Sequence, residues 1–151
     1  MKPLKQQILA FFEKKKIAIA GVSRDPKKFS TLVFRELKEK GFDVYPINPN
    51  VDTIHGFTCY QSVSELPVDV ASLLLVTPKA QTLDLLKEAV SKGFRNIWIQ
   101  QMSETQDTIA YAKSQNLNLI TKQCILMYAE PVKGFHKFHR TVKQIFGLLP
   151  K

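Results

Sequence analysis

A segment near the amino terminus combines residue types that bind phosphate. It reads KIAIAGVSRDPKKFS (residues 16–30), an apolar run followed by glycine, hydroxyl and basic residues. Gly21 permits close backbone approach, Ser23 supplies a hydroxyl, and a helix that follows offers unpaired N–H groups at the positive end of its dipole. Three basic residues after the glycine add charge. The segment therefore predicts a loop (residues 21–30, the Gly21 loop) that holds a ligand with several phosphate charges.

The Gly21 loop departs from two common nucleotide motifs. A dinucleotide fingerprint counted from Gly21 needs glycines where Ser23 and Pro26 stand, and the loop has no Gly-Lys-Ser/Thr ending of a Walker motif. After the second expected strand, residues 45–49 contain no carboxylate of the kind that binds the ribose of a nicotinamide dinucleotide. Without this carboxylate, a phosphate on the ribose would not be repelled by a negative charge at this position. Residues 48–50 are therefore either a ligand contact or simply a turn.

The apolar periodicity predicts alternating strands and helices around these loops. Strands are expected within residues 17–20, 43–47, 70–76, 94–100 and 117–121, helices within 3–14, 30–41, 79–93, 104–116 and 131–147, a short edge strand at 57–60 and a single helical turn at 62–66. The second helix is expected to begin at Ser30 as its N-cap and to end at Gly41. Its expected buried stripe consists of Leu32, Val33 and Leu37.

This alternation predicts one α/β domain over residues 1–151, a Rossmann-like three-layer sandwich with a mostly parallel sheet and right-handed crossovers. A chain of 151 residues with 44% hydrophobic content is long enough for one core. Ligands of such sheets bind outside the carboxyl ends of the strands. The loops at residues 21–30, 48–50, 77–79 and 100–103 should therefore meet there. The apolar helix at 131–147 is expected to pack on the domain or on its copy in a homodimer.

The formal net charge of +9 is concentrated at the two ends of the chain. Residues 1–40 carry eleven Lys/Arg against four Asp/Glu, and residues 131–151 carry five against none. Basic ends suit nucleic acid, an anionic lipid surface or a phosphorylated ligand, or they are only a solvated face. Spacings of the common nucleic-acid modules are absent, and no apolar run has the length of a signal peptide or membrane span. We therefore expect neither nucleic acid nor membrane as a partner, and a cytoplasmic location.

The cysteines and histidines do not form a recognisable catalytic or metal motif. Cys59 and Cys124 lack CxxC spacing, so two buried thiols are expected instead of zinc ligands or a disulfide. His136 and His139 lie three apart on an expected helix, where two imidazoles make an incomplete metal site and a surface or packing role is preferred. His55 has no partner that the sequence identifies. We therefore predict no catalytic residue and no metal.

Four segments, in this order, resemble a known family. They are GVSRDPKKFS after the first strand, VYPINPN after the second, LLLVTP after the central strand and IWIQQ after the next, with KQCILMYAEP near the end. Together they resemble the small CoA-binding proteins of the Rossmann type, relatives of the nucleotide domain of the succinyl-CoA synthetase alpha subunit. The resemblance covers about residues 15–130.

The resemblance implies coenzyme A or an acyl-CoA as the ligand. The implied contacts are a phosphate cradle of Gly21, Val22, Ser23 and Arg24, the helix start at Lys28, Phe29 and Ser30, adenosine contacts at Asn48 and Pro49, a wall of Val76, Thr77 and Pro78, and Gln100 in the fourth loop. Relatives often have a glycine shortly after this glutamine, whereas residues 100–103 here read Gln-Gln-Met-Ser. The synthetases use a phosphorylatable histidine on a second domain, so the resemblance implies binding without evident catalysis.

Two other functions remain open at this point. The same loops could serve an NAD(P)-binding sensor or enzyme, although residues 45–49 lack the usual acid. The basic ends could instead make the chain an interaction module for an acidic partner.

Overall fold

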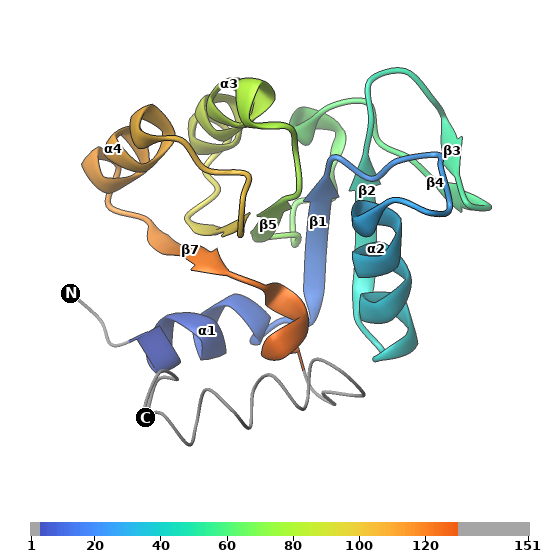
Figure 1. Cartoon of the computed structure of the whole chain (residues 1–151), viewed down its shortest axis with the longest axis horizontal. Helices are drawn as coiled ribbons and strands as arrows, with labels where there is room; N and C mark the ends of the chain where they lie inside the picture. Colours follow the sequence, from blue (N-terminus) through green and yellow to red (C-terminus); the bar gives the residue numbers. More distant parts are fainter. Residues whose placement is uncertain (1–3, 130–151) are drawn as a thin grey trace.

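The computed structural model describes residues 4–129 (Figure 1). In chain order the elements are α1 (Leu4–Phe12), β1 (Lys16–Ala20), α2 (Phe29–Glu39), β2 (Asp43–Ile47), β3 (Thr53–Ile54), β4 (Phe57–Thr58), the 3-10 turn η1 (Val63–Glu65), β5 (Ser72–Leu75), α3 (Lys79–Ser91), β6 (Asn96–Gln100), α4 (Gln106–Ser114), β7 (Asn118–Gln123) and the 3-10 turn η2 (Ile125–Met127). The helix expected at 131–147, with His136 and His139, lies outside the described residues.

Five strands form one parallel sheet in the order β2-β1-β5-β6-β7. The chain moves from β1 to β2 on one side and then returns to β5 on the other side of β1. The strand order therefore reverses at β1, and the crevice between β1 and β5 is the point where such folds bind ligands. The predicted Rossmann-like α/β fold with a mostly parallel sheet is confirmed.

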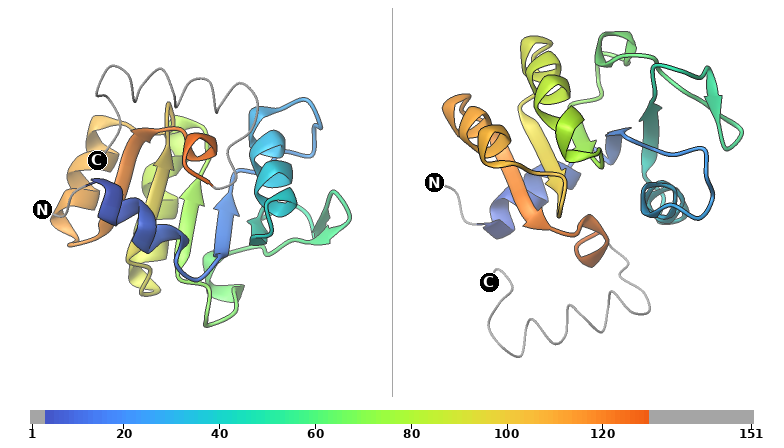
Figure 2. Two further views of the ribbon diagram at one scale, coloured as in Figure 1. Left: turned by 90° about the horizontal axis from the view of Figure 1, so that it is seen from below. Right: turned by 45° about the horizontal axis from the view of Figure 1, so that its top comes forward.

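Helices cover both faces of the sheet, which gives three layers (Figure 2). Ile17 and Ile19 of β1 face the layer formed by α1, α2 and η2, where they pack in one core cluster with Phe11 and Leu37. Alternate strand residues such as Ala18 face the opposite layer, formed by α3 and α4. Because both faces of the sheet are buried, its strands are apolar at almost every position, as the sequence indicated.

Helix α2 differs from its prediction at its start and along its buried face. It begins at Phe29 after Lys28 as N-cap, so the expected cap at Ser30 is wrong. The Ser30 hydroxyl instead accepts a hydrogen bond from the Ser23 N–H, because the Gly21 loop folds back over the first turn. Leu32 is 37% exposed, and Phe34 takes its place in the stripe. Gly41 ends the helix as predicted, with φ +92°.

A short strand is present within the expected residues 57–60, but it does not join the main sheet. Phe57–Thr58 forms β4, which pairs with β3 in a separate antiparallel hairpin, and Tyr60 alone bridges to Ile47 of the main sheet. The two residues between β3 and β4 are His55 and Gly56, which have φ values of +49° and +82°. Positive φ at both central residues is typical of a tight hairpin turn, and this turn directs the segment away from the sheet edge. The expected turn at 62–66 is confirmed as η1.

Two further expectations concern the described residues. Cys59 and Cys124 are both buried free thiols, as predicted. In the part of the chain that the structure describes, no helix is long and apolar enough to cross a membrane.

Candidate ligand-binding site

The sheet register places three predicted loops side by side. Ala20, the last residue of β1, lies opposite Ile47 of β2 and Leu75 of β5. The residues that follow these strand ends therefore begin their loops next to one another, and the Val76 N–H donates to the Ala20 carbonyl at 2.9 Å. The structure thus brings together the candidate residues at 21–24, 48–49 and 76–78.

Gly21 is required by a neighbouring strand end. Its φ is +102°, and a Cβ atom at this position would lie 2.3 Å from the Val76 carbonyl oxygen. Any other residue would therefore collide with the backbone of the chain that leaves β5. The sequence analysis explained this glycine by the approach of a ligand, but the contact present in the structure is with Val76.

Polar groups within the Gly21 loop fold it onto itself. The Ser23 hydroxyl accepts from the Asp25 N–H at 3.0 Å, and the Asp25 carboxylate accepts from the Lys27 N–H at 2.9 Å. The Lys28 N–H donates to the Asp25 carbonyl at 3.2 Å. The Ser23 hydroxyl acts here as an acceptor and keeps its own proton for donation to another group. The loop is therefore shaped before any ligand arrives.

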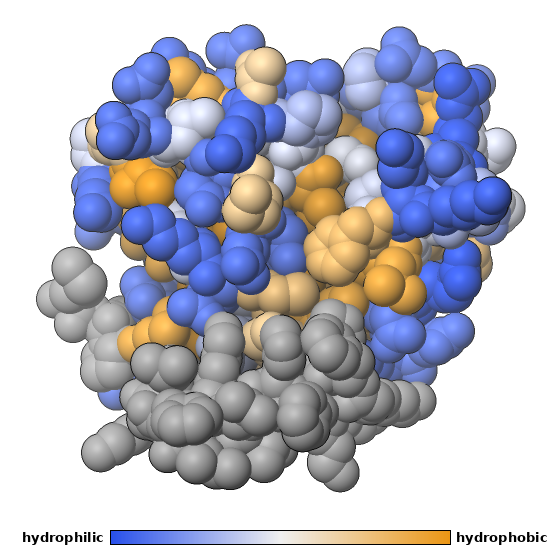
Figure 3. Space-filling view, viewed as in Figure 1, coloured by the Kyte–Doolittle hydropathy of each residue, from blue (hydrophilic) through white to orange (hydrophobic). Residues whose placement is uncertain are grey.

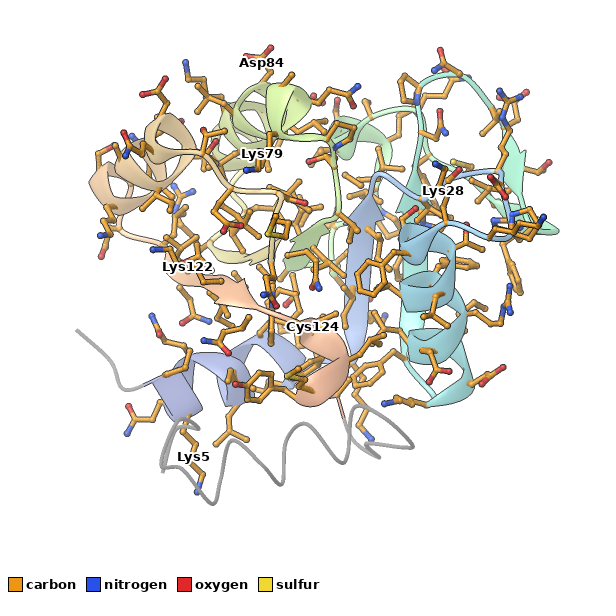
Figure 4. All side chains as sticks on the ribbon, in the orientation of Figure 1. Lys5, Lys28, Lys79, Asp84, Lys122 and Cys124 are labelled. Atoms are coloured by element: carbon orange, nitrogen blue, oxygen red, sulfur yellow. The ribbon has the colours of Figure 1, made fainter. Side chains whose placement is uncertain are left out.

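The positive ends of two helices border the crevice between β1 and β5. Neither Lys28, the N-cap of α2, nor Pro78, the N-cap of α3, makes a side-chain capping bond. The first N–H groups of a helix lack carbonyl partners within the helix and carry a partial positive charge. Figure 4 labels Lys28 and Lys79 at these two helix starts; both are exposed, and so is Arg24 of the Gly21 loop. This arrangement favours an anion.

The loop after β2 is a turn, which was one of the two interpretations given above. The Asn48 side-chain oxygen accepts from the Asn50 N–H at 2.9 Å, while Pro49 is exposed. Below this turn lies Cys59, whose sulfur is 3.9 Å from the Asn48 carbonyl oxygen. Burial raises the pKa of the Cys59 thiol. A ligand contact at Asn48 and Pro49 stays a prediction.

The remaining candidate residues differ in their accessibility. Thr77 is buried, and its hydroxyl lies 2.6 Å from that of Thr82, so it supports the start of α3. Gln100 is 2% exposed, and its side-chain oxygen accepts from the Ile125 N–H at 3.1 Å, which fixes η2. Phe29, in contrast, is 44% exposed, and Met102, which was not among the predicted site residues, is 68% exposed. Apolar surface is visible in the middle of this face, with hydrophilic residues around it (Figure 3).

Sequence reasoning missed two residues that contact the Gly21 loop. The Thr31 hydroxyl lies 2.9 Å from the Ser23 carbonyl oxygen and 2.8 Å from that of Asp25. His55, on the β3–β4 turn, places Nε2 at 2.8 Å from the same Ser23 oxygen. Thr31 directly follows the loop and could have been suspected as a residue that stabilises it. His55 is 32 residues away from Ser23, and no sequence pattern indicates that contact.

We found no group of three or more His, Cys, Asp or Glu residues that could hold a metal ion among residues 4–129. The predicted absence of a metal site therefore stays a prediction for the whole chain.

Comparison with known proteins shows the family to which this chain belongs. Residues 15–130 match the family model described as CoA binding domain. The alpha subunit of the ADP-forming acetate–CoA ligase II of Pyrococcus furiosus is 31% identical over 126 residues, which are 76% of this chain and 28% of that subunit. The chain thus spans less than a third of the length of the first curated ligases that it matches.

Solved structures agree with the sequence match. A conserved hypothetical protein from Pyrococcus furiosus has 38% sequence identity and a TM-score of 0.70, and the similarity covers 73% of this chain and 95% of that one. A hypothetical protein from Pyrococcus horikoshii has 27% identity and a TM-score of 0.76, with 89% and 98% covered. The resemblance inferred from the four sequence segments is confirmed, and the chain belongs to the CoA-binding domain family.

Proposed function

We propose that this protein binds coenzyme A or an acyl-CoA at the carboxyl ends of β1, β2 and β5. In this proposal the diphosphate lies on the Gly21 loop and the start of α2, and the adenosine lies at Asn48 and Pro49. Val76, Thr77 and Pro78 form the wall beneath the ligand. The observation that carries the proposal is the pair of uncapped helix starts, with exposed basic side chains, at the crevice where this family's fold binds ligands.

The surroundings of β2 favour CoA over a nicotinamide dinucleotide. Residues 45–49 contain no acid, and the nearby Asp52 carboxylate accepts from the Gln61 side-chain amide at 3.0 Å. A 3′-phosphate on the adenosine ribose therefore meets no carboxylate from residues 45–49, while the exposed Arg24 and Lys28 supply positive charge. The exposed apolar side chains of Phe29 and Met102 suit the less polar pantetheine arm. The wall residues and Gln100 are part of the proposed contact set on the basis of the family resemblance.

A binding role follows from what the site contains. The loops offer hydrogen-bond donors and positive charge, which hold a ligand. Within residues 4–129 the Thr31 hydroxyl lies 3.4 Å from His55 Nε2, but it donates to the Ser23 and Asp25 carbonyls and is not arranged as an activated nucleophile. The ADP-forming ligases to which the chain is similar are several times longer. We therefore propose that the protein presents CoA or an acyl-CoA rather than transforming it by itself.

Calorimetry with four ligands tests the proposal. CoA should bind most tightly, dephospho-CoA should be weaker, and NAD and NADP weaker still. Loss of one charge-assisted contact to the 3′-phosphate costs about 1.5 to 3 kcal/mol, or roughly ten- to a hundredfold in affinity. The difference should shrink when salt is raised, because salt screens exposed charges. Equal or tighter binding of NAD or NADP would favour the dinucleotide alternative.

A pair of charge reversals locates the ligand. Arg24→Glu places a negative charge beside the proposed diphosphate and should weaken CoA strongly. Lys5→Glu changes the net charge of the protein by the same two units, but Lys5 lies on α1, far from the Gly21 loop (Figure 4), and should leave the affinity unchanged. Removal of residues 131–151 should also leave CoA binding intact; its loss would favour an interaction through the basic end.

A further inference from the structure

The Gly21 loop has an external support. Figure 1 shows that the chain between β1 and α2 runs beside the β3–β4 hairpin. The exposed His55 of the hairpin turn reaches across to the loop, with Nε2 at 2.8 Å from the Ser23 carbonyl oxygen. A carbonyl oxygen only accepts hydrogen bonds, so Nε2 is the protonated nitrogen that donates here.

The Ser23 carbonyl oxygen receives a second hydrogen bond from the Thr31 hydroxyl, which lies beside His55 Nε2. The Thr31 hydroxyl lies 2.9 Å from the Ser23 oxygen and shares its single proton with the Asp25 carbonyl oxygen at 2.8 Å. The Thr31 proton is thus divided between two carbonyl oxygens, whereas His55 Nε2 donates its proton only to the Ser23 oxygen. The 3.4 Å separation between His55 Nε2 and the Thr31 oxygen is then a contact between two donors that point at the same acceptor.

The direction of this carbonyl decides what the loop offers to a ligand. The Ser23 carbonyl and the Arg24 N–H belong to one peptide group, and in a trans peptide they point in opposite directions. Because the carbonyl is turned toward the side chains of Thr31 and His55, the Arg24 N–H points away from these two side chains. This N–H has no hydrogen-bond partner within residues 4–129. If the peptide turned over, a carbonyl oxygen would instead face the ligand and repel a phosphate.

We propose that His55 is a positioning residue for the diphosphate, which fixes the Ser23–Arg24 peptide so that its N–H faces the ligand. The proposal rests on the proposed function, because the ligand is CoA. The His55 ring also packs against α2, where it lies 6.1 Å from the ring of Phe34. Phe34 packs in turn against Phe57 of the hairpin, at 5.6 Å. A groove of about 360 Å³ lies beside these rings, so the imidazole is not enclosed. The hydrogen bond to Ser23 therefore keeps the side chain in place.

Three variants separate this role from a general effect on the hairpin. His55→Ala removes the donor. His55→Gln keeps an N–H donor on a side chain long enough to reach the Ser23 oxygen. Phe57→Ala removes the aromatic contact between the hairpin and α2 but leaves the donor to the loop. All three changes are at exposed positions, so the fold should survive.

CoA affinity is the first readout, measured by calorimetry. His55→Ala should bind CoA about tenfold more weakly than the wild type does, which corresponds to the loss of about one hydrogen bond to a charged ligand. Dephospho-CoA should lose affinity by the same factor, because the two ligands share the diphosphate. His55→Gln should recover most of the affinity, and Phe57→Ala should stay close to the wild type. Unchanged CoA affinity in His55→Ala, or an equal loss in Phe57→Ala, would overturn the proposal.

Trypsin cleavage without ligand is the second readout, since the loop contains exposed Arg24, Lys27 and Lys28. Cleavage after these residues should be faster in His55→Ala than in the wild type or Phe57→Ala. If the wild type does not bind CoA, the proposed function fails, and the cleavage rates alone decide whether His55 holds the loop. Equal rates in all variants would then refute that role as well.

Discussion

Replacement of Gly21 by alanine is the most direct test of how the site is built. The new Cβ would lie 2.3 Å from the Val76 carbonyl oxygen and 2.7 Å from its carbonyl carbon. Both are backbone atoms at the end of β5, which cannot rotate away as a side chain would. Either the Gly21 loop or the chain after β5 must move, and both belong to the proposed CoA site.

The magnitude has two sources that can be separated. An alanine at φ +102° pays about 1 to 2 kcal/mol for its left-handed backbone. Forcing an extra methyl group into packed backbone adds about 1 to 3 kcal/mol. Gly93 is a matched control, because its φ is +94° and a Cβ there meets no atom within 4 Å. Gly93→Ala should therefore lose about 1 to 2 kcal/mol, and Gly21→Ala about 2 to 5 kcal/mol.

Urea unfolding of the two variants provides the measurement. Trp98 is the single tryptophan of the chain and is fully buried, so its fluorescence reports the loss of the core. Gly21→Ala should unfold at a clearly lower urea concentration than Gly93→Ala and should bind CoA more weakly. If the two variants have the same unfolding free energy, the contact with Val76 does not constrain the loop, and this reasoning is wrong.

Four further predictions concern the loop and the buried thiol. Thr31→Val removes the hydroxyl that serves two carbonyls and should lower the free energy of unfolding by about 1 to 3 kcal/mol in urea, whereas wild-type stability would argue against these hydrogen bonds. Ser23→Ala should weaken CoA by about 1 kcal/mol in calorimetry, and a change in turnover of an acyl-CoA with affinity intact would indicate an enzyme. Cys59 should react slowly with a thiol reagent at neutral pH, because burial raises its pKa and little thiolate forms; fast labelling of the folded protein would contradict this. The thiol of the unfolded chain has the lower pKa and ionises first, so the contribution of Cys59 to stability should be complete below about pH 8.5 and should decline as pH rises above it. The free energy of unfolding of Cys59→Ala should therefore decline less over the same pH range.

The sequence by itself determined the α/β class and the position of most elements. Strand β2 was predicted at residues 43–47 and is found there, and β5 lies within the predicted 70–76. These predictions succeed because the strands of a parallel sheet that is covered on both faces need continuous apolar segments. The helices between them need apolar residues repeated at helical spacing, so the two patterns can be distinguished in the sequence. The four loop segments, in their order, were also sufficient to identify the family.

Tertiary structure alone decided which polar groups meet in the site. Ser30 was predicted as a cap from its local position, but it accepts from Ser23 because the loop folds back over α2. The need for glycine at Gly21 comes from Val76, which the chain reaches only after two further strands and a hairpin. His55 and Ser23 meet because the hairpin packs beside α2. Such contacts depend on the strand order and on the path of a short hairpin, and neither leaves a periodic pattern in the sequence, since each contact involves single residues far apart in the chain.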